Sequence, residues 1–413
     1  MREECGLNTR REFPIVTVTK KAEASLRRGH PWVYAEEITG RVGQTENGAL
    51  VDVCSQKGAY LGTGLLSEQS KIRVRLLSQN ANERFSAAFW ERRLRYALDY
   101  RQTVMGDDFT CCRLVFGEAD GLPGLTVDRF SDLLVTQVLT YGIEQRKAML
   151  YEMLVRLLAE RGAPVRGLFE RNDVAIRALE GLPQEKGWFD GLPHPDSPVT
   201  QITENGILYD VDVENGQKTG FFLDQKYNRL AVAKLAAGKR VLDCFTHNGS
   251  FALNAAKGGA AHVTAVDVSE TAIAAAKQNA VRNGLADRMD FLCTDVFDLL
   301  PALADSGGKP YDFIILDPPA FTKSRKTAES AARGYKEINY RAMKLLPRGG
   351  YLATCSCSHF MPAARFETML DSAAADAQVQ LRQVEARQQC KDHPILRSVP
   401  ETDYLKFYIF QVV

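Results

Sequence analysis

The sequence feature that most constrains the fold is a buried strand that ends in an acid and two prolines. The apolar run 311–315 leads directly into Leu316-Asp317-Pro318-Pro319-Ala320-Phe321. Two prolines cannot continue a central strand, so the backbone leaves the sheet at Asp317. Ligands bind at such strand ends in open α/β sheets. An acid held there beside a rigid turn and an aromatic ring, Phe321, predicts a site for the edge of a planar base.

A second strand, over residues 351–358, carries two thiols to the same edge of the sheet. Cys355 and Cys357 are two residues apart, so their side chains point to the same face of an extended strand. Geometry alone does not choose between them as a nucleophile. Cys357 lies further out along the strand, whereas Cys355 is expected in the strand's core. Acid, aromatic and thiol together suggest chemistry on a nucleobase.

Length and composition limit the classes of protein that fit. A chain of 413 residues, 45% of them apolar and 25% charged, indicates two or three globular domains. The net charge of +1 gives no overall basic character, so nucleic-acid binding has to rest on local basic surfaces. No apolar run approaches the roughly 20 residues of a membrane helix, and no signal peptide is seen, which predicts a cytoplasmic protein without a membrane partner. Scattered cysteines without a CxxC pair predict no metal site.

Three stretches follow one another along the chain. Residues 1–78 contain short apolar runs separated by turns, which predicts a small RNA-binding β-barrel with a basic helix near residues 22–29. Residues 79–195 mix strands with helices near 85–101 and 143–160, which predicts a small α+β middle domain. In residues 196–413 a hairpin around Asn205-Gly206 precedes alternating strands and helices, which predicts a doubly wound parallel α/β sheet.

Acids at the ends of successive strands in residues 196–413 predict a nucleoside cofactor. A buried strand and tight turn run from Arg240 through Asp243 to Asn248 and Gly249, and the next strand ends at Asp267. An acid at the end of that second strand is placed to accept hydrogen bonds from ribose hydroxyls. The turn has one glycine where a dinucleotide site needs G-x-G-x-x-G, and Asp243 would repel a diphosphate.

The acidic turn instead suits a cation that carries adenosine, and S-adenosylmethionine is such a cation. We expect Asp243 to face its sulfonium and amino groups, Asp267 its ribose, and Asp295, at the end of the third strand, its adenine amino group. The alternative role for Asp243 and Asp267 is capping of helix N-termini.

The sequence resembles the bacterial S-adenosylmethionine-dependent ribosomal RNA (cytosine-5) methyltransferases with an N-terminal PUA domain, of the large-subunit methyltransferase I type. The resemblance spans essentially the whole chain, and its most specific parts are the segment 217–229 and the step Ser356-Cys357-Ser358. It also includes the following segments: 29–32, 121–128, 243–249, 317–321 and 392–394. It implies a PUA-like β-barrel at 1–78, a middle domain at 79–195 and a Rossmann-like methyltransferase domain at 196–413.

The resemblance also implies roles for individual residues. Cys357 would be the nucleophile, with Asp317 and Phe321 steadying the base. The residues implied at the cofactor and the adjoining cleft are Phe222, Asp224, Arg229, Asp243, Phe245, Asn248, Gly249, Asp267, Ser269, Asp295 and Asp317. Two features depart from the family pattern: a second thiol, Cys355, and His359 in place of the usual glycine. The resemblance implies ribosomal RNA of the large subunit, 23S, as the substrate, and the proteins of this type suggest a homodimer as the form to test.

The expected mechanism is addition of a thiolate to carbon 6 of cytosine, which makes carbon 5 nucleophilic toward a methyl donor. A free thiol has a pKa of roughly 8.5, so positive charge near the cysteine is required. The bound cation and the loop with Lys323, Arg325 and Lys326 are candidate sources. Three alternatives remain: methylation of a base nitrogen such as guanine N7 without a thiol, an RNA-binding assembly factor without activity, and, more remotely, an oxidoreductase.

Overall fold

A computed structural model describes residue 11, residues 13–321 and residues 328–413, and it divides the chain into two compact units. Unit 1 combines the described residues up to Ile202 with Val211–Leu223 and Lys391–Thr402. Unit 2 consists of Thr203–Asp210, Asp224–Cys390 and Asp403–Val413. Three segments of the predicted third domain, 196–202, 211–223 and 391–402, therefore belong to unit 1. No helix in the described part of the chain combines the length and apolar character needed to cross a membrane.

The first part of unit 1 is a six-stranded sheet that wraps around one helix. Its strands follow the order β2-β6-β5-β4-β1-β3. Their bounds are β1 Ile15–Val18, β2 Trp32–Tyr34, β3 Ile38–Val42, β4 Leu50–Ser55, β5 Tyr60–Leu66 and β6 Ile72–Ser78. Helix α1, Lys20–Arg27, begins after Thr19, whose side chain accepts a hydrogen bond from the Ala22 amide. Ala22 and Leu26 of this helix are buried with Val16, Val18 and other apolar strand residues in one core.

The second part of unit 1 is a five-stranded sheet in the order β11-β10-β9-β8-β7. Its elements are α2 Ala87–Met105, β7 Cys111–Phe116, β8 Leu125–Phe130, β9 Leu133–Val138, α3 Tyr141–Glu144, α4 Lys147–Glu160, β10 Gly167–Asn172 and β11 Glu185–Trp188. The expected single helix over 143–160 is thus two helices, α3 and α4. The break falls at Gln145 and Arg146, where the Arg146 guanidinium turns back to the Gly142 carbonyl.

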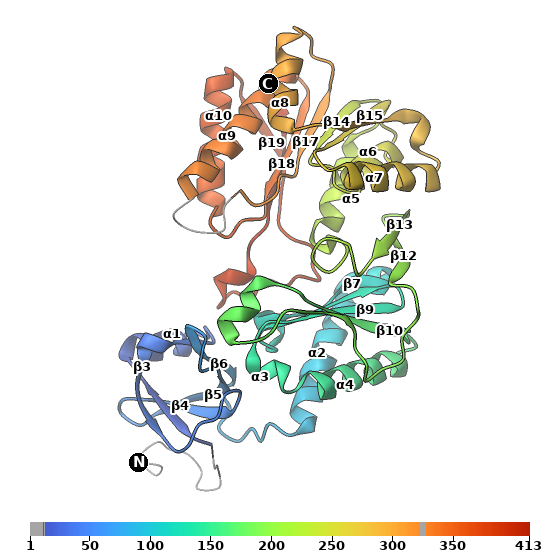
Figure 1. The fold of residues 1–413 in the computed structure, drawn as a ribbon. Helices are drawn as coiled ribbons and strands as arrows, with labels where there is room; N and C mark the ends of the chain where they lie inside the picture. The colour runs from blue at the N-terminus through green and yellow to red at the C-terminus, as the bar shows by residue number, and fades with distance from the viewer. Residues whose placement is uncertain (1–10, 12, 322–327) are drawn as a thin grey trace. The chain divides into compact units, whose positions relative to one another are not determined.

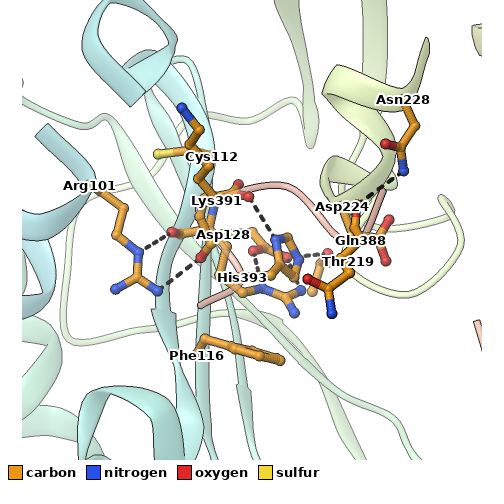
Figure 2. A network of polar contacts seen from close by, with 12 residues as sticks. Arg101, Cys112, Phe116, Asp128, Thr219, Asp224, Asn228, Gln388, Lys391 and His393 are labelled. Carbon is orange, nitrogen blue, oxygen red and sulfur yellow. Dashed lines mark hydrogen bonds and ion pairs between the residues drawn. The ribbon is translucent and has the colours of Figure 1, made fainter. Parts of the chain in front are cut away.

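A buried polar network ties three distant segments of unit 1 together. The Arg113 guanidinium forms two bonds with the Asp128 carboxylate, at 2.7 and 2.8 Å, and Thr219 Oγ1 donates to Asp128 Oδ2 at 2.6 Å. The Arg113 amide donates to Asp392 Oδ2 at 2.8 Å, and His393 Nδ1 lies 2.8 Å from Asp392 Oδ1. Figure 2 shows part of this network around Asp128 and His393. The segments 211–223 and 391–402 are therefore fixed within unit 1 by side chains as well as by chain connection.

Unit 2 is a doubly wound sheet of seven strands in the order β16-β15-β14-β17-β18-β20-β19. Its strands are β14 Arg240–Cys244, β15 His262–Asp267, β16 Met289–Cys293, β17 Phe313–Leu316, β18 Tyr351–Ser356, β19 Leu381–Arg387 and β20 Lys406–Val412. Strands β14 to β18 pair in parallel, whereas β20 runs antiparallel to β18 and to β19. The carboxyl ends of the parallel strands and the start of β20 consequently share one edge of the sheet.

Helices cover both faces of the sheet in unit 2. They are α5 Lys226–Leu235, α6 Ser250–Lys257, α7 Glu270–Arg282, α8 Val296–Asp305, α9 Ala328–Leu345 and α10 Ala363–Ala377. Figure 1 shows α9 and α10 on one side of the sheet and α5, α6 and α7 on the other. A core of buried residues from the strands and from α8, α9 and α10 fills the first of these layers. The predicted α/β architecture of this region is confirmed.

The predicted hairpin around Asn205-Gly206 is formed by β12, Val199–Glu204, and β13, Ile207–Asp212. Asn205 and Gly206 both have positive φ, at 52° and 72°, as a tight two-residue turn requires. The Asn205 side chain donates to the Lys226 carbonyl at 2.9 Å and to Asn254 Oδ1 at 3.0 Å. The tip of the hairpin is thereby attached to α5 and α6 within unit 2.

We predict that Asp128→Ala lowers the free energy of unfolding by about 3–5 kcal/mol, because it leaves the partly buried Arg113 guanidinium without its ion-pair partner. Urea unfolding monitored by tryptophan fluorescence measures the change. The matched control is Asp132→Ala, because Asp132 pairs with an exposed arginine, Arg166. That change should cost no more than about 1 kcal/mol. Equal losses in the two variants would contradict the structural importance of the network.

Candidate functional site

The candidate site lies at the edge of the unit 2 sheet where the parallel strands end. Register pairs place Cys244 beside Val266 and Leu316, and Leu316 beside Thr354. Asp243, Asp267, Asp317 and the thiols of β18 therefore come from neighbouring strands at the same edge. Adjacent strands are about 4.8 Å apart, so these groups are close enough for their charges to interact.

Asp243 is a fully buried carboxylate at the end of β14. Its Oδ2 accepts hydrogen bonds from Thr246 Oγ1 at 2.5 Å and from the Ala252 amide at 2.9 Å. Its Oδ1 has no hydrogen-bond partner among the described residues. The pKa of Asp243 is raised to about 7, chiefly by burial and also by the nearby carboxylates of Asp317 and Asp267, against the two hydrogen bonds, which lower it. A cationic ligand with N–H donors would satisfy Oδ1 and relieve this repulsion.

The turn after β14 is held in a backbone conformation that most residues avoid. Phe245, His247 and Gly249 have φ values of 64°, 52° and 82°. At Gly249 a Cβ would come within 3.0 Å of the Ala276 Cβ, so this position also needs the small residue for the close approach of α7. Strain of this kind is typical of functional loops. It is stabilised here by the His247 amide, which donates to Asp267 Oδ2 at 2.9 Å.

The other predicted cofactor residues divide into two groups. Asp267 ends β15, and its carboxylate also accepts a bond from the Ser269 amide at 3.0 Å. Ser269 and Asp295 are the N-caps of α7 and α8, with side chains that accept bonds from the Ala272 and Phe297 amides at 3.3 and 2.8 Å. Capping of helix N-termini, the alternative that the sequence raised for Asp243 and Asp267, is thus a role of Ser269 and Asp295, and Asp243 also bonds an amide in the first turn of α6, that of Ala252. Each capping oxygen retains a lone pair that a ligand can use.

Asp317 follows β17 and is joined to the first thiol of β18. Cys355 Sγ donates to Asp317 Oδ1 at 2.9 Å, and Gln225 Nε2 donates to the same oxygen at 3.2 Å. Desolvation raises the pKa of Asp317, whereas the bond from Cys355 and the charge of Arg229 lower it. Cys355 is 1% exposed, and its pKa is raised well above the ordinary value by burial and by the charge of Asp317. Cys355 is therefore a neutral thiol that donates to the carboxylate.

Cys357 differs from Cys355 in its surroundings. It follows the last residue of β18 and is half-buried, with the buried residues Ser356 and Ser358 on either side.

Phe321 belongs to an aromatic cluster, with its ring centroid 4.7 Å from that of Tyr335, 5.9 Å from Phe297 and 6.5 Å from Phe245. Lys323, Arg325 and Lys326, which the sequence suggested as a source of positive charge, lie outside the described residues.

Three residues from the segment 217–229 lie in different surroundings. Arg229 is buried and pairs with Glu204 of the hairpin, NH1 to Oε1, at 2.6 Å. Asp224 is also buried in unit 2, and its Oδ2 accepts a hydrogen bond from Tyr404 at 2.6 Å. Phe222 belongs to unit 1, where the Lys218 ammonium lies 4.7 Å from its ring centroid.

Sequence reasoning did not single out Gln225, Tyr404 or Lys406, which the structure places at this edge. Gln225 reaches Asp317 and, at 3.3 Å, Cys355 Sγ. Lys406 begins β20 and is 6% exposed. Gln225 falls inside the segment 217–229 that carried the family resemblance, so that segment was its only signal. Lys406 had no signal, because nothing in the sequence shows that β20 folds back beside β18.

The residues present fit S-adenosylmethionine. The buried Asp243 oxygen without a partner and the carboxylates around it suit a ligand with a positive sulfonium and an ammonium group. Asp267 would accept bonds from the ribose hydroxyls of such a cofactor. Among the described residues no group of three or more acids, histidines or cysteines could hold a metal ion.

Comparisons with known proteins agree with the cofactor that the acids at this edge suit. Residues 184–410 match the model of a family described as S-adenosylmethionine-dependent methyltransferase, and residues 16–79 match the model of a PUA-like domain. The chain is 38% identical over 403 residues to Ribosomal RNA large subunit methyltransferase I of Klebsiella pneumoniae (strain 342), covering 97% of this chain and 99% of that protein. It is 40% identical over 400 residues to the protein of the same name from Aliivibrio fischeri (strain ATCC 700601 / ES114), covering 96% and 99%.

A solved structure supports the fold alone. A putative SAM-dependent methyltransferase from Streptococcus mutans superposes with a TM-score of 0.80 at 22% identity, covering 96% of this chain and all of that one. The expectations of a PUA-like start, a Rossmann-like methyltransferase fold and S-adenosylmethionine as cofactor are confirmed by these matches.

We predict that S-adenosylmethionine binds more weakly as the pH falls below about 7. The cation favours ionised Asp243, and its raised pKa means that a proton has to leave on binding. The dissociation constant should rise up to about tenfold between pH 7 and pH 6, as for release of one proton. Calorimetric titration in buffers of different ionisation enthalpy measures both the affinity and the proton. Asp243→Asn should bind weakly with little pH dependence; an unaltered pH dependence in that variant would assign the proton to another group.

Proposed function

We propose that this chain, which belongs to the S-adenosylmethionine-dependent methyltransferase family, forms 5-methylcytosine in large-subunit ribosomal RNA and uses Cys357 as its nucleophile. Ribosomal RNA as the substrate is supported by the names of relatives that align with nearly the whole chain. Carbon 5 as the target is supported by one observation above all. A half-buried thiol follows β18, and a carboxylate, Asp317, follows the adjacent strand β17.

The two thiols differ in a way that favours Cys357. Cys355 is buried, bonded to Asp317 and disfavoured as a thiolate by the neighbouring negative charge. Cys357 is accessible in part and lies beyond the end of the strand. A nucleophile has to reach the base and ionise, so Cys357 meets the requirement better than Cys355.

The residues of the site then act in a defined order. The Cys357 thiolate adds to carbon 6 of the cytosine, which makes carbon 5 nucleophilic. Asp317 holds the ring nitrogen or the amino group of the base, and its position is fixed by Cys355 and Gln225. When bound, S-adenosylmethionine supplies an electrophilic methyl group to carbon 5. A solvent water then takes the carbon 5 proton, the electrons of that C–H bond re-form the double bond between carbons 5 and 6, and the Cys357 thiolate leaves carbon 6.

Methylation of a base nitrogen would use the same cofactor site and Asp317 but no thiol. The two activities give different products, so hydrolysis of modified ribosomal RNA to nucleosides separates them. We expect 5-methylcytidine to be present in RNA from cells with this protein and absent from RNA from cells without it. A methylated guanosine in its place would support the alternative.

We predict that Cys357→Ala lowers the methylation rate by at least about a thousandfold, because the covalent route is lost, while cofactor binding is retained. RNA that contains 5-fluorocytidine provides a direct measurement, since the adduct cannot lose a carbon 5 proton and stays attached. The wild-type protein should form a denaturant-stable RNA complex in the presence of the cofactor, and Cys357→Ala should not.

The matched control is Cys293→Ala, which removes an exposed thiol of unit 2 at the end of β16. This variant should methylate and form the covalent complex like the wild type. A complex that persists in Cys357→Ala and disappears in Cys355→Ala would transfer the nucleophilic role to Cys355.

A further inference from the structure

We propose that Lys406 is the positioning residue that stabilises Cys357 as a thiolate and fixes the loop that carries it. The inference rests on the proposed function, since it identifies the positive charge that thiol catalysis at Cys357 requires. Lys406 acts through Cys357 and does not itself contact the reacting atoms of the base.

The fold brings Lys406 to the thiols because β20 is antiparallel to its neighbour. In the pairing of β18 with β20, Ser356 lies opposite Lys406 and Cys355 opposite Phe407. The first residue of β20 is therefore beside the last residue of β18, and Cys357 is the next residue along the chain. The ammonium comes from a segment 49 residues beyond the thiol, yet it lies on the adjacent strand.

Lys406 is attached to the loop after Cys357 by a hydrogen bond. Its Nζ donates to the Ser358 carbonyl at 2.7 Å and to the Tyr404 carbonyl at 2.7 Å. An ammonium has three N–H bonds, and these carbonyls take two of them. Because Ser358 follows Cys357 directly, the first bond restricts the backbone that carries the nucleophile. Tyr404, in turn, donates to Asp224.

The electrostatic interaction between Lys406 and Cys357 also supports this role for Lys406. The pKa of Lys406 is lowered to about 8, chiefly by desolvation, and negative charge on Cys357 is the largest influence that opposes this lowering, ahead of Asp403 and Cys355. Such an interaction is mutual, so the ammonium favours the thiolate by the same free energy. The Asp403 carboxylate is itself bonded by Gln388 Nε2, at 3.2 and 3.1 Å. Cys355 is held as a neutral thiol by Asp317.

Arg229, another cation near the site, has a partner of its own. Arg229 pairs with buried Glu204, and its charge acts on Asp317. A lysine whose pKa is lowered by burial can also accept the thiol proton. Transfer of the Cys357 Sγ proton to the neutral Lys406 amine gives one thiolate and one ammonium, with no change in total charge.

The test measures the reactivity of Cys357 as a function of pH in the full-length protein without cofactor or RNA. Iodoacetamide reacts with the thiolate, and peptide mass spectrometry gives the alkylation rate of each cysteine separately. In Lys406→Met we expect the midpoint of the Cys357 curve to move up by about one pH unit, with an about tenfold slower reaction at pH 7. Lys406→Gln, which can still donate to a carbonyl, should show the same shift, whereas Lys406→Arg should restore most of the reactivity.

Cys293 is the control within each sample, because it is exposed at the end of β16 and its curve should not move. Circular dichroism and cofactor binding check that each variant is folded. An unchanged Cys357 midpoint in folded Lys406→Met would overturn the proposal. A slower reaction at every pH without a shifted midpoint would assign Lys406 a structural role only, which also contradicts it.

A reciprocal measurement leaves Lys406 in place. Cys357→Ala should lower the pH at which acetic anhydride modifies Lys406, because the thiolate that supports the ammonium is gone; an unchanged pH would contradict the pairing. These readouts do not depend on the product formed on RNA. If the Cys357 midpoint shifts in Lys406→Met but the product is an N-methylated nucleoside, the proposed function is wrong and the inference about Lys406 holds. If the midpoint does not shift but the product is 5-methylcytidine, only the inference is wrong.

Discussion

The physical constraint on which the site depends is the order of the strands in the unit 2 sheet. From β15 through β14, β17 and β18 to β20, neighbouring strands bring Asp267, Asp243, Asp317, the two thiols and Lys406 to one edge. Neighbouring strands are about 4.8 Å apart, so the charged groups along this edge change from carboxylates to an ammonium within a few strands. The carboxylates suit a cationic cofactor and the ammonium suits a thiolate.

Burial makes these charges effective. Asp243 and Lys406 are both almost completely removed from solvent, so the pKa of the acid rises to about 7 and that of the lysine falls to about 8. Each group loses hydration that its neighbours replace only in part, which costs stability. Groups whose pKa values approach neutrality in this way are typical of sites that bind charge or move protons. The hydrogen bonds to Asp243 from Thr246 and Ala252 offset part of that cost.

Local pattern was enough to predict much of the fold. The short apolar runs of residues 1–78 form strands, as β1 and β4 show, because apolar residues bounded by turns leave few alternatives. The short strands β2 and β11 were not predicted, since their pairing with β6 and β10 is a tertiary effect. The helix start at Thr19 was also missed, although Thr19 is a strong N-cap residue.

The residues of the site likewise divide into those that local sequence pattern predicts and those that depend on tertiary contacts. Asp243, Asp267 and Asp317 could be predicted because each follows an apolar strand, and strand ends gather at one edge of a parallel sheet. The roles that depend on contacts between distant segments could not, as Gln225 and Lys406 show. The positive φ at Phe245 was equally impossible to predict, because a bulky aromatic residue rarely adopts that conformation and tertiary structure imposes it here.

The presence of two thiols on β18 has a physical explanation in the different charges beside them. Cys355 lies against Asp317, and a thiolate there would meet a carboxylate at 2.9 Å, so this sulfur is held in the protonated form and serves as a donor. The hydrogen bond from Cys355 occupies one lone pair of Asp317 Oδ1. It also fixes the orientation of the carboxylate, and with it the direction of Oδ2. Cys357 lies two residues beyond Cys355, past the Asp317 carboxylate. The charged group on the strand beside it is the ammonium of Lys406. One strand can therefore carry a neutral thiol and an ionisable one, because the neighbouring strand on one side supplies an acid and the neighbouring strand on the other supplies a base.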